Sequence, residues 1–215
     1  MDQSKIILAI GRQFGSGGRE IGQKLAKAFG IGYYDKELIT EAAKESGLCE
    51  DIFERADERA NHALSYAFTM GYSSFIGMFT PANDILSNDT LFKIQSDTIR
   101  NIADKGSCVL VGRCADYILR DDPACLSVFI SSTIETRIQK IVERMGVTVE
   151  QAKELMTKND KSRATYYNYY TNKTWGMASS YNLCVDASIL GIDGTVDFIK
   201  RFVDQKLEQR PPHFG

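Results

Sequence analysis

The chain has 215 residues, of which 43% are hydrophobic and 25% charged, and its formal net charge is −2. This length suits one domain with a single core and an inserted subdomain, and the slightly acidic balance argues against a general nucleic-acid-binding protein. No stretch is long and apolar enough to cross a membrane, and five cysteines without C-x-x-C spacing predict reduced thiols in a cytoplasmic protein.

The first predicted unit is a strand, a glycine-rich loop and a helix. Ile6–Ile10 is an unbroken apolar run, as in parallel strands that are buried on both faces, and helical spacing begins at Ile21. The loop between them contains Phe14, Gly15, Ser16, Gly17, Gly18, Arg19 and Glu20. Glycines let successive N–H groups face one concave turn, and the following helix adds its free amides. These residues therefore predict a phosphate-binding loop.

The loop differs from the P-loop pattern G-x-x-x-x-G-K-[ST]. If Gly18-Arg19 stands for Gly-Lys, the leading glycine falls on Gln13 and the hydroxyl residue falls on Glu20. Arg19 would then supply the cation, because its planar guanidinium matches phosphate oxygens. The alternative is a glycine turn that only closes a βα unit. A dinucleotide-binding loop is disfavoured, because the glycines do not have G-x-G-x-x-G spacing.

The next elements are a short strand at Gly32–Asp35 and a helix that starts at Lys36. Asp35 has two interpretations that are compatible. It lies at the carboxyl end of a parallel strand, where ligands bind in open α/β sheets, and it is a suitable N-cap for the helix. Farther on, aromatic residues and methionines gather in Tyr66–Phe79, which predicts a flexible cover, a homodimer surface or part of the core.

Three further apolar runs predict strands, at Ser107–Val111, Leu126–Ile130 and Asn182–Asp186. Arg113 follows the first of these runs, which makes it a candidate phosphate ligand; the alternative is a surface ion pair. Strands that alternate with helices predict an α/β doubly wound sheet.

Two helices are predicted by capping-box patterns. Ser132–Glu135 precedes a helix that carries Arg137, and Thr148–Gln151 precedes a longer one. The longer helix runs into a segment of lysines, arginine and tyrosines, Lys158–Tyr170. This segment has three interpretations. It is a nucleic-acid-binding stretch that uses charge and stacking, a phosphate-clamping lid, or a solvated helix face with tyrosines buried beneath it.

In chain order, the motifs GSGGRE, YYD, VGRCAD, KNDKSRATYYNYY and YNLCVD resemble the cytidylate kinase-like family, a branch of the P-loop nucleoside monophosphate kinases. The resemblance implies an α/β P-loop NTPase fold, with a five-stranded parallel sheet and helices on both faces. It implies one domain whose core is 4–35, 106–150 and 180–208, with an NMP-binding helical insertion at about 36–105 and a lid at about 157–176.

The same resemblance implies phosphoryl transfer from ATP, with Mg²⁺, to a nucleoside monophosphate similar to CMP or dCMP, or to a related small acceptor. The alternative is a nucleotide-binding regulatory protein with little or no catalysis. Neither nucleic acid nor a membrane is expected as a partner. No residues are assigned to the metal.

The resemblance also carries over residue roles. Phe14 to Glu20 match the donor-phosphate loop, and the expected catalytic residues are Arg19, Arg113 and Arg163. The expected substrate-binding residues are Asp35, Lys36, Arg113, Arg137, Lys161 and Arg163. Three positions depart from the family pattern: Cys114 replaces the acid of G-R-D, Lys36 replaces the serine of D-S-G, and Glu41 lies near the position of a later arginine of that motif.

Overall fold

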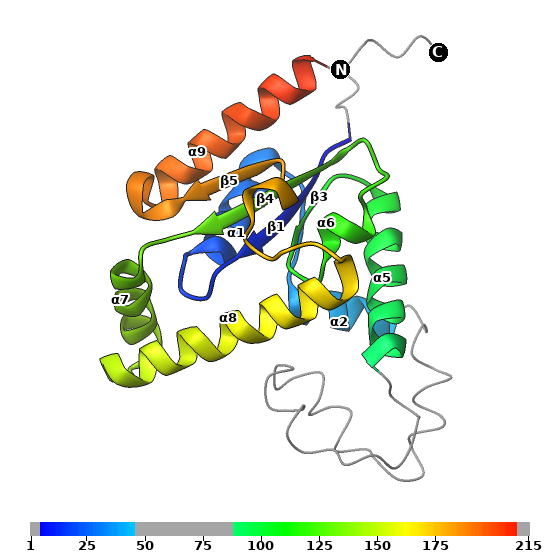
Figure 1. Cartoon of the computed structure of the whole chain (residues 1–215). Helices are drawn as coiled ribbons and strands as arrows, with labels where there is room; N and C mark the ends of the chain where they lie inside the picture. The colour runs from blue at the N-terminus through cyan, green and yellow to red at the C-terminus, as the bar shows by residue number, and fades with distance from the viewer. Residues whose placement is uncertain (1–4, 46–87, 210–215) are drawn as a thin grey trace, which may run out of the picture.

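The computed structural model describes residues 5–45 and 88–209, which fold around a five-stranded parallel sheet with the order β2-β3-β1-β4-β5 (Figure 1). The strands are β1 (Ile7–Arg12), β2 (Gly32–Tyr34), β3 (Cys108–Val111), β4 (Cys125–Ser131) and β5 (Leu183–Asp186). The central strand β1 pairs in parallel with β3 on one side and with β4 on the other. The predicted fold class and all five predicted strands are therefore confirmed.

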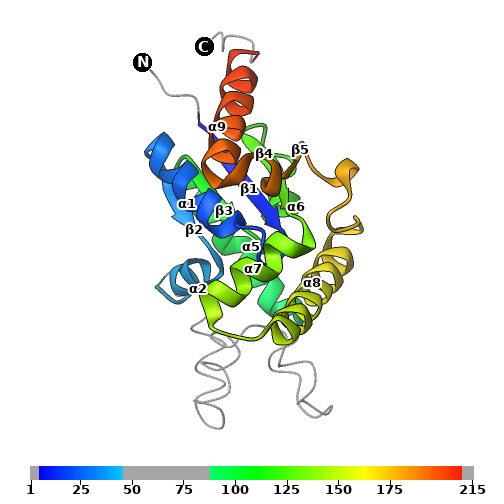
Figure 2. The ribbon, with the colours of Figure 1, turned by 90° about the vertical axis from the view of Figure 1, so that its left-hand side faces the viewer.

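Helices cover both faces of this sheet (Figures 1 and 2). They are α1 (Gly18–Phe29), α2 (Lys36–Glu45), α5 (Asn88–Lys105), α6 (Ala115–Ile118), α7 (Ile134–Met145), α8 (Val149–Thr171) and α9 (Ala187–Glu208), with a 3₁₀ turn η2 (Ala178–Ser180). In Figure 1, α7 and α8 lie at the end of the sheet to which the arrows of β1 and β4 point. Open α/β sheets bind ligands at this end, beyond the carboxyl ends of the strands.

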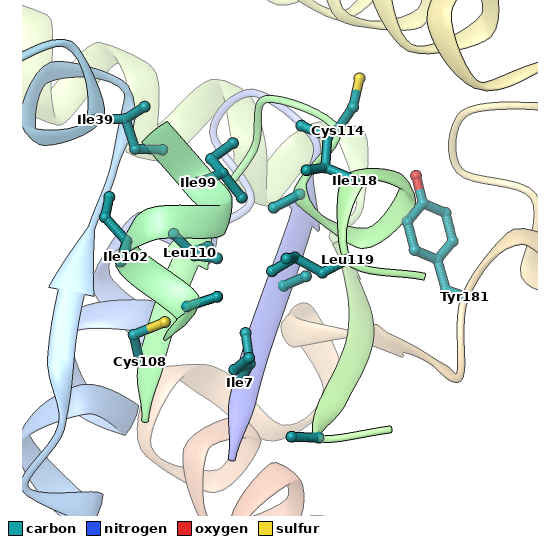
Figure 3. Packing of buried hydrophobic residues seen from close by; sticks show 14 of the residues in the cluster. Ile7, Ile39, Ile99, Ile102, Cys108, Leu110, Cys114, Ile118, Leu119 and Tyr181 are labelled. Atoms are coloured by element: carbon teal, nitrogen blue, oxygen red, sulfur yellow. The ribbon is translucent and has the colours of Figure 1, made fainter. Parts of the chain in front are cut away.

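The core consists of two apolar layers, because successive residues of a strand point to opposite faces. On one face, Leu8 and Ile10 pack in a cluster with Ile21 and Leu25 of α1 and with residues of α9. On the other face, Ile7 packs with residues of α2, α5 and α6. Figure 3 shows the second cluster, which includes Ile39, Ile99, Ile102, Cys108, Leu110, Cys114, Ile118, Leu119 and Tyr181. Burial on both faces explains why β1 and β3 contain unbroken apolar runs.

Two of the three predicted helix starts are confirmed as written. Asp35 caps α2, because its Oδ1 accepts hydrogen bonds from the amides of Glu37 and Leu38 at 3.2 and 3.3 Å. Thr148 and Gln151 form the predicted capping box of α8. The predicted box at Ser132–Glu135 is wrong by one residue, because the N-cap of α7 is Thr133. The hydroxyl of Thr133 accepts a hydrogen bond from the amide of Thr136. Glu135 is therefore only two residues from the N-cap, one too few for a capping box.

The proposed subdivision of the chain stays a prediction. The described part of the predicted insertion consists of α2 and α5, and most of the predicted lid belongs to the continuous helix α8. The proposed homodimer segment Tyr66–Phe79 lies outside the described residues. None of the helices described in 5–45 and 88–209 is long and apolar enough to span a membrane.

Candidate active site

The glycine loop joins β1 to α1 and has the conformation that a phosphate cradle needs. Gly15 and Gly17 have positive φ, 81° and 85°, where residues other than glycine are strained. A Cβ on Gly15 would lie 2.9 Å from the carbonyl oxygen of Arg137. Among the described residues, no acceptor is found for the amides of Gly15, Gly17 and Gly18. The loop therefore fits an anionic group such as a polyphosphate.

The amide at the start of the loop is already bound to a carboxylate. The N–H of Phe14 donates to Oδ1 of Asp160, a residue of α8, at 2.7 Å. Nε of Arg137 donates to the carbonyl oxygen of Phe14 at 2.7 Å, and its Nη2 forms an ion pair with Asp160. Arg137 is only 4% exposed. This arginine, predicted to bind substrate, instead ties the loop, α7 and α8 together.

Arg19, the predicted loop cation, contacts the residues that follow β2. Its guanidinium forms ion pairs with Asp35 at 2.7 Å and with Glu37 at 3.4 Å. Burial opposes the charge on Asp35, but hydrogen bonds from Glu37 and Leu38 and the charge of Arg19 outweigh it, and the pKa of Asp35 falls below its ordinary value. Glu20 is exposed and forms an ion pair with Lys24 at 3.3 Å.

A cavity of about 180 Å³ opens beside the loop, at the carboxyl ends of β1 and β3. Arg113 and Lys36 line it from the ends of β3 and β2, and Arg163 lines it from α8. Arg12, the last residue of β1, is a fourth cation in the wall that the sequence analysis did not identify. Lys161, by contrast, is exposed and does not line the cavity. Three predicted substrate-binding cations are thus brought together.

These cations lie close together, and within the described residues no ion pair joins any of them to a carboxylate. Burial, then the charge of Arg113, lowers the pKa of Lys36 to about 8. Burial, then the charges of Arg163 and Arg113, lowers the pKa of Arg12 to about 9. Like charges in a partly desolvated wall repel one another, and an anion between them would relieve this repulsion. The cavity is therefore built for an anionic ligand.

Part of the cavity wall is aromatic and contains one acid. The carboxylate of Asp116 accepts a hydrogen bond from the hydroxyl of Tyr167 at 2.7 Å, and burial raises its pKa. Trp175 and Tyr181 complete this part of the wall. Sequence reasoning did not single out Asp116, although its place soon after the third strand was a usable signal. Such a surface suits a flat, partly polar group.

Arg113 reaches the cavity from a strained turn. Gly112, Arg113 and Cys114 all have positive φ, 84°, 59° and 56°, and Cys114 then caps α6. The guanidinium of Arg113 lies 5.8 Å from the centre of the Tyr166 ring, within the range of a cation–π contact. The turn holds Arg113 at the end of β3, where the sequence analysis expected a phosphate ligand.

The described residues do not assemble a metal site of their own: among them, no group of three or more His, Cys, Asp or Glu side chains could hold an ion. The hydroxyl of Ser16 donates to the carbonyl oxygen of Gln13 at 3.0 Å. Glu20, at the position that the sequence analysis compared with the P-loop hydroxyl, is paired with Lys24. We therefore assign no described residue to magnesium.

Binding of an anion in the cavity is expected to take up protons near pH 8. At that pH about half of the Lys36 ammonium groups are neutral, and an anion favours the charged form, so each binding event should take up ~0.5 proton. Uptake should shrink at pH 6.5, where Lys36 is already charged. Calorimetry with sulfate, whose charge is constant in this range, in two buffers of different ionisation enthalpy measures the uptake. The variant Lys36→Met should lose most of it; unchanged uptake would contradict the assignment.

Comparison with known proteins agrees with this geometry. Residues 7–189 match the cytidylate kinase-like family. A cytidylate kinase from Methanopyrus kandleri is 23% identical, with 96% of this chain and 97% of that protein covered. The crystal structure of an uncharacterised protein from Eubacterium ventriosum is 32% identical, with a TM-score of 0.70 over 93% of this chain and 99% of the other.

A shikimate kinase from Bacteroides thetaiotaomicron shares the fold, with a TM-score of 0.52 at 11% identity over 94% of this chain and 99% of the other. The family match covers most of the chain and includes the glycine loop, the cavity and α8. The chain therefore belongs to the cytidylate kinase-like family and has the α/β fold of P-loop kinases.

Proposed function

We propose that this protein transfers the terminal phosphoryl group of ATP to a nucleoside monophosphate, or to a related small phosphorylated acceptor. One observation carries the proposal: four cations, none of them in an ion pair with a carboxylate of the described residues, line a cavity beside a glycine loop. In the same part of the chain, the loop amides of Gly15, Gly17 and Gly18 have no acceptor. A phosphate on the acceptor would meet these cations, and the phosphates of the donor would meet the loop. The two groups would then be adjacent, as transfer requires.

Bound ATP supplies the phosphoryl group, and magnesium is expected from the family. The residues of this chain position the two substrates and neutralise the negative charge of their phosphates. The amides of Gly15, Gly17 and Gly18 bind donor phosphates, and Lys36 and Arg113 hold the acceptor's phosphate. Arg163 offsets the charge on the moving group. The helix α8, which forms one wall of the cavity, keeps out water that would otherwise accept the phosphoryl group.

The aromatic part of the cavity wall suits the nucleobase or another flat part of the acceptor. Asp116 and Tyr167 provide hydrogen-bonding groups there. In the family, the acid of the G-R-D motif contributes to base recognition, and Cys114 stands at its position here. We therefore do not assign CMP or dCMP as the acceptor, although they are the first to test.

The proposal predicts phosphoryl transfer to at least one small phosphorylated acceptor. A screen would follow ADP release and the new phosphorylated product with ATP, Mg²⁺ and each of CMP, dCMP, UMP, AMP and non-nucleotide monophosphates. The preferred acceptor should show saturable transfer well above hydrolysis of ATP alone, because an acceptor that fills the cavity displaces the water that would compete with it. A folded protein that transfers to none of them would contradict the proposal.

A nucleotide-binding regulator is the second candidate. Two observations favour it. The loop contains no lysine, and the amide of Phe14 already donates a hydrogen bond to Asp160. Tight ATP binding without transfer or hydrolysis would favour this function over the first.

A further inference from the structure

The start of α1 identifies the residue that corresponds to the lysine of a P-loop. In the pattern G-x-x-x-x-G-K-[ST], the lysine follows the last glycine and opens the helix. Here Gly17 caps α1 and Gly18 is its first residue. Gly18 therefore stands at the position of the lysine, and Arg12, five residues before Gly17, stands at the position of the leading glycine. Relative to the pattern, glycine and cation have exchanged places.

The side chain of Arg12 runs through the space that a side chain at position 18 would use. A Cβ on Gly18 would lie 2.6 Å from Cβ and 3.0 Å from Cγ of Arg12. The guanidinium then lies against Gly112, whose φ of 84° also calls for glycine, and a Cβ there would overlap it. The two glycines allow Arg12 to pass from the end of β1, over the start of α1, into the cavity wall.

Among the described residues, Arg12 forms no ion pair with a carboxylate. Burial and then the charges of Arg163 and Arg113 lower its pKa to about 9, although the charge of Asp35 opposes this shift. At neutral pH its guanidinium remains charged. A cation so placed, between the loop on one side and the acceptor-binding cations on the other, is stabilised by an anion that reaches both.

Arg19 is placed differently. Its ion pairs with Asp35 and Glu37 satisfy its charge. More than half of its side-chain surface is exposed, and it does not line the cavity. Moving it onto a bound phosphate would break the 2.7 Å contact with Asp35.

We propose that Arg12, at the end of β1, takes over the role of the P-loop lysine. Its guanidinium binds the phosphoryl group that moves from donor to acceptor. This inference rests on the proposed function and names the cation that performs it. Gly18 and Gly112 are kept free of side chains so that the guanidinium can reach this point.

The test combines removal and relocation of the charge. Arg12→Met should lower phosphoryl transfer about 10²-fold and weaken the binding of tripolyphosphate, measured by calorimetry, about tenfold. The double variant Arg12→Gly with Gly18→Lys restores the standard order of the pattern, and it should recover both readouts to within about tenfold of the starting protein. Arg120→Met, which removes an exposed arginine paired with Asp121, should change neither.

Three outcomes would overturn the inference. The first is an Arg12→Met variant that binds tripolyphosphate and transfers phosphate like the starting protein. The second is a double variant that folds, as judged by circular dichroism, but recovers neither readout. The third is a larger loss in Arg19→Met than in Arg12→Met. If Arg12→Met does not fold, the double variant decides. If the starting protein transfers to no acceptor, the proposed function fails, and tripolyphosphate binding still tests Arg12.

Discussion

Replacing Arg163 by methionine is expected to lower kcat/KM for phosphoryl transfer by about 10³-fold. Arginines that neutralise the moving phosphoryl group in kinases and GTPases contribute effects of this size. Arg163 lines the cavity from α8, and its Nη1 donates to the carbonyl oxygen of Arg12 at 3.1 Å. The loss should fall mainly on kcat, measured in a steady-state assay with the preferred acceptor, because the charge on the moving group is greatest during transfer.

Arg144→Met is the matched control for this variant. The guanidiniums of Arg144 and Arg163 lie at similar distances from the centre of the Phe14 ring, 5.4 and 5.5 Å. Arg144 is exposed on α7 and does not line the cavity, so its loss should change kcat/KM less than about threefold. Equal losses in the two variants would mean that contact with Phe14, rather than charge in the cavity, carries the effect.

Replacing Arg137 by methionine is expected to reduce the free energy of unfolding by about 3 kcal/mol. The change leaves the carboxylate of Asp160, which is 18% exposed, without its ion-pair partner, and it removes the hydrogen bond to the carbonyl oxygen of Phe14. Urea unfolding followed by circular dichroism measures the difference between the variant and the starting protein.

Two further variants separate the possible causes. Adding Asp160→Asn to Arg137→Met should recover more than half of the loss, because the amide oxygen can still accept from Phe14 while the unpaired charge is gone. Arg100→Met breaks an exposed pair with Asp97 and should cost less than about 0.5 kcal/mol. A loss of similar size for Arg137 and Arg100 would show that the buried pair has no special role.

The strands were the most predictable part of the fold. Four of the five lie in apolar runs, and the burial of β1 on both faces follows from its position in the middle of the sheet. The helix starts were also accessible, because capping depends on residues within one turn. The error at Thr133 shows the limit: two adjacent residues, Ser132 and Thr133, both suit an N-cap, and a local pattern does not distinguish them.

The site was predictable where a residue follows a strand, and not where its contacts come from distant parts of the chain. Arg113 reaches the cavity as expected for a residue that follows a parallel strand, and Lys36, expected from the family resemblance, also lines it. Arg12 was missed because its path depends on Gly18 and on Gly112, which is 100 residues away. The contact between Phe14 and Asp160 spans 146 residues, and a local pattern contains no sign of it.

The left-handed turn at Gly112, Arg113 and Cys114 sets binding against stability at one position. A residue with a side chain costs roughly 1 kcal/mol in this conformation, a cost that glycine avoids. An arginine at position 113 therefore weakens the fold, while its rigid backbone aims the guanidinium before any ligand arrives. Glycine at position 113 would avoid that cost, so the arginine exchanges roughly 1 kcal/mol of stability for a cation that is held at the cavity wall before a ligand binds.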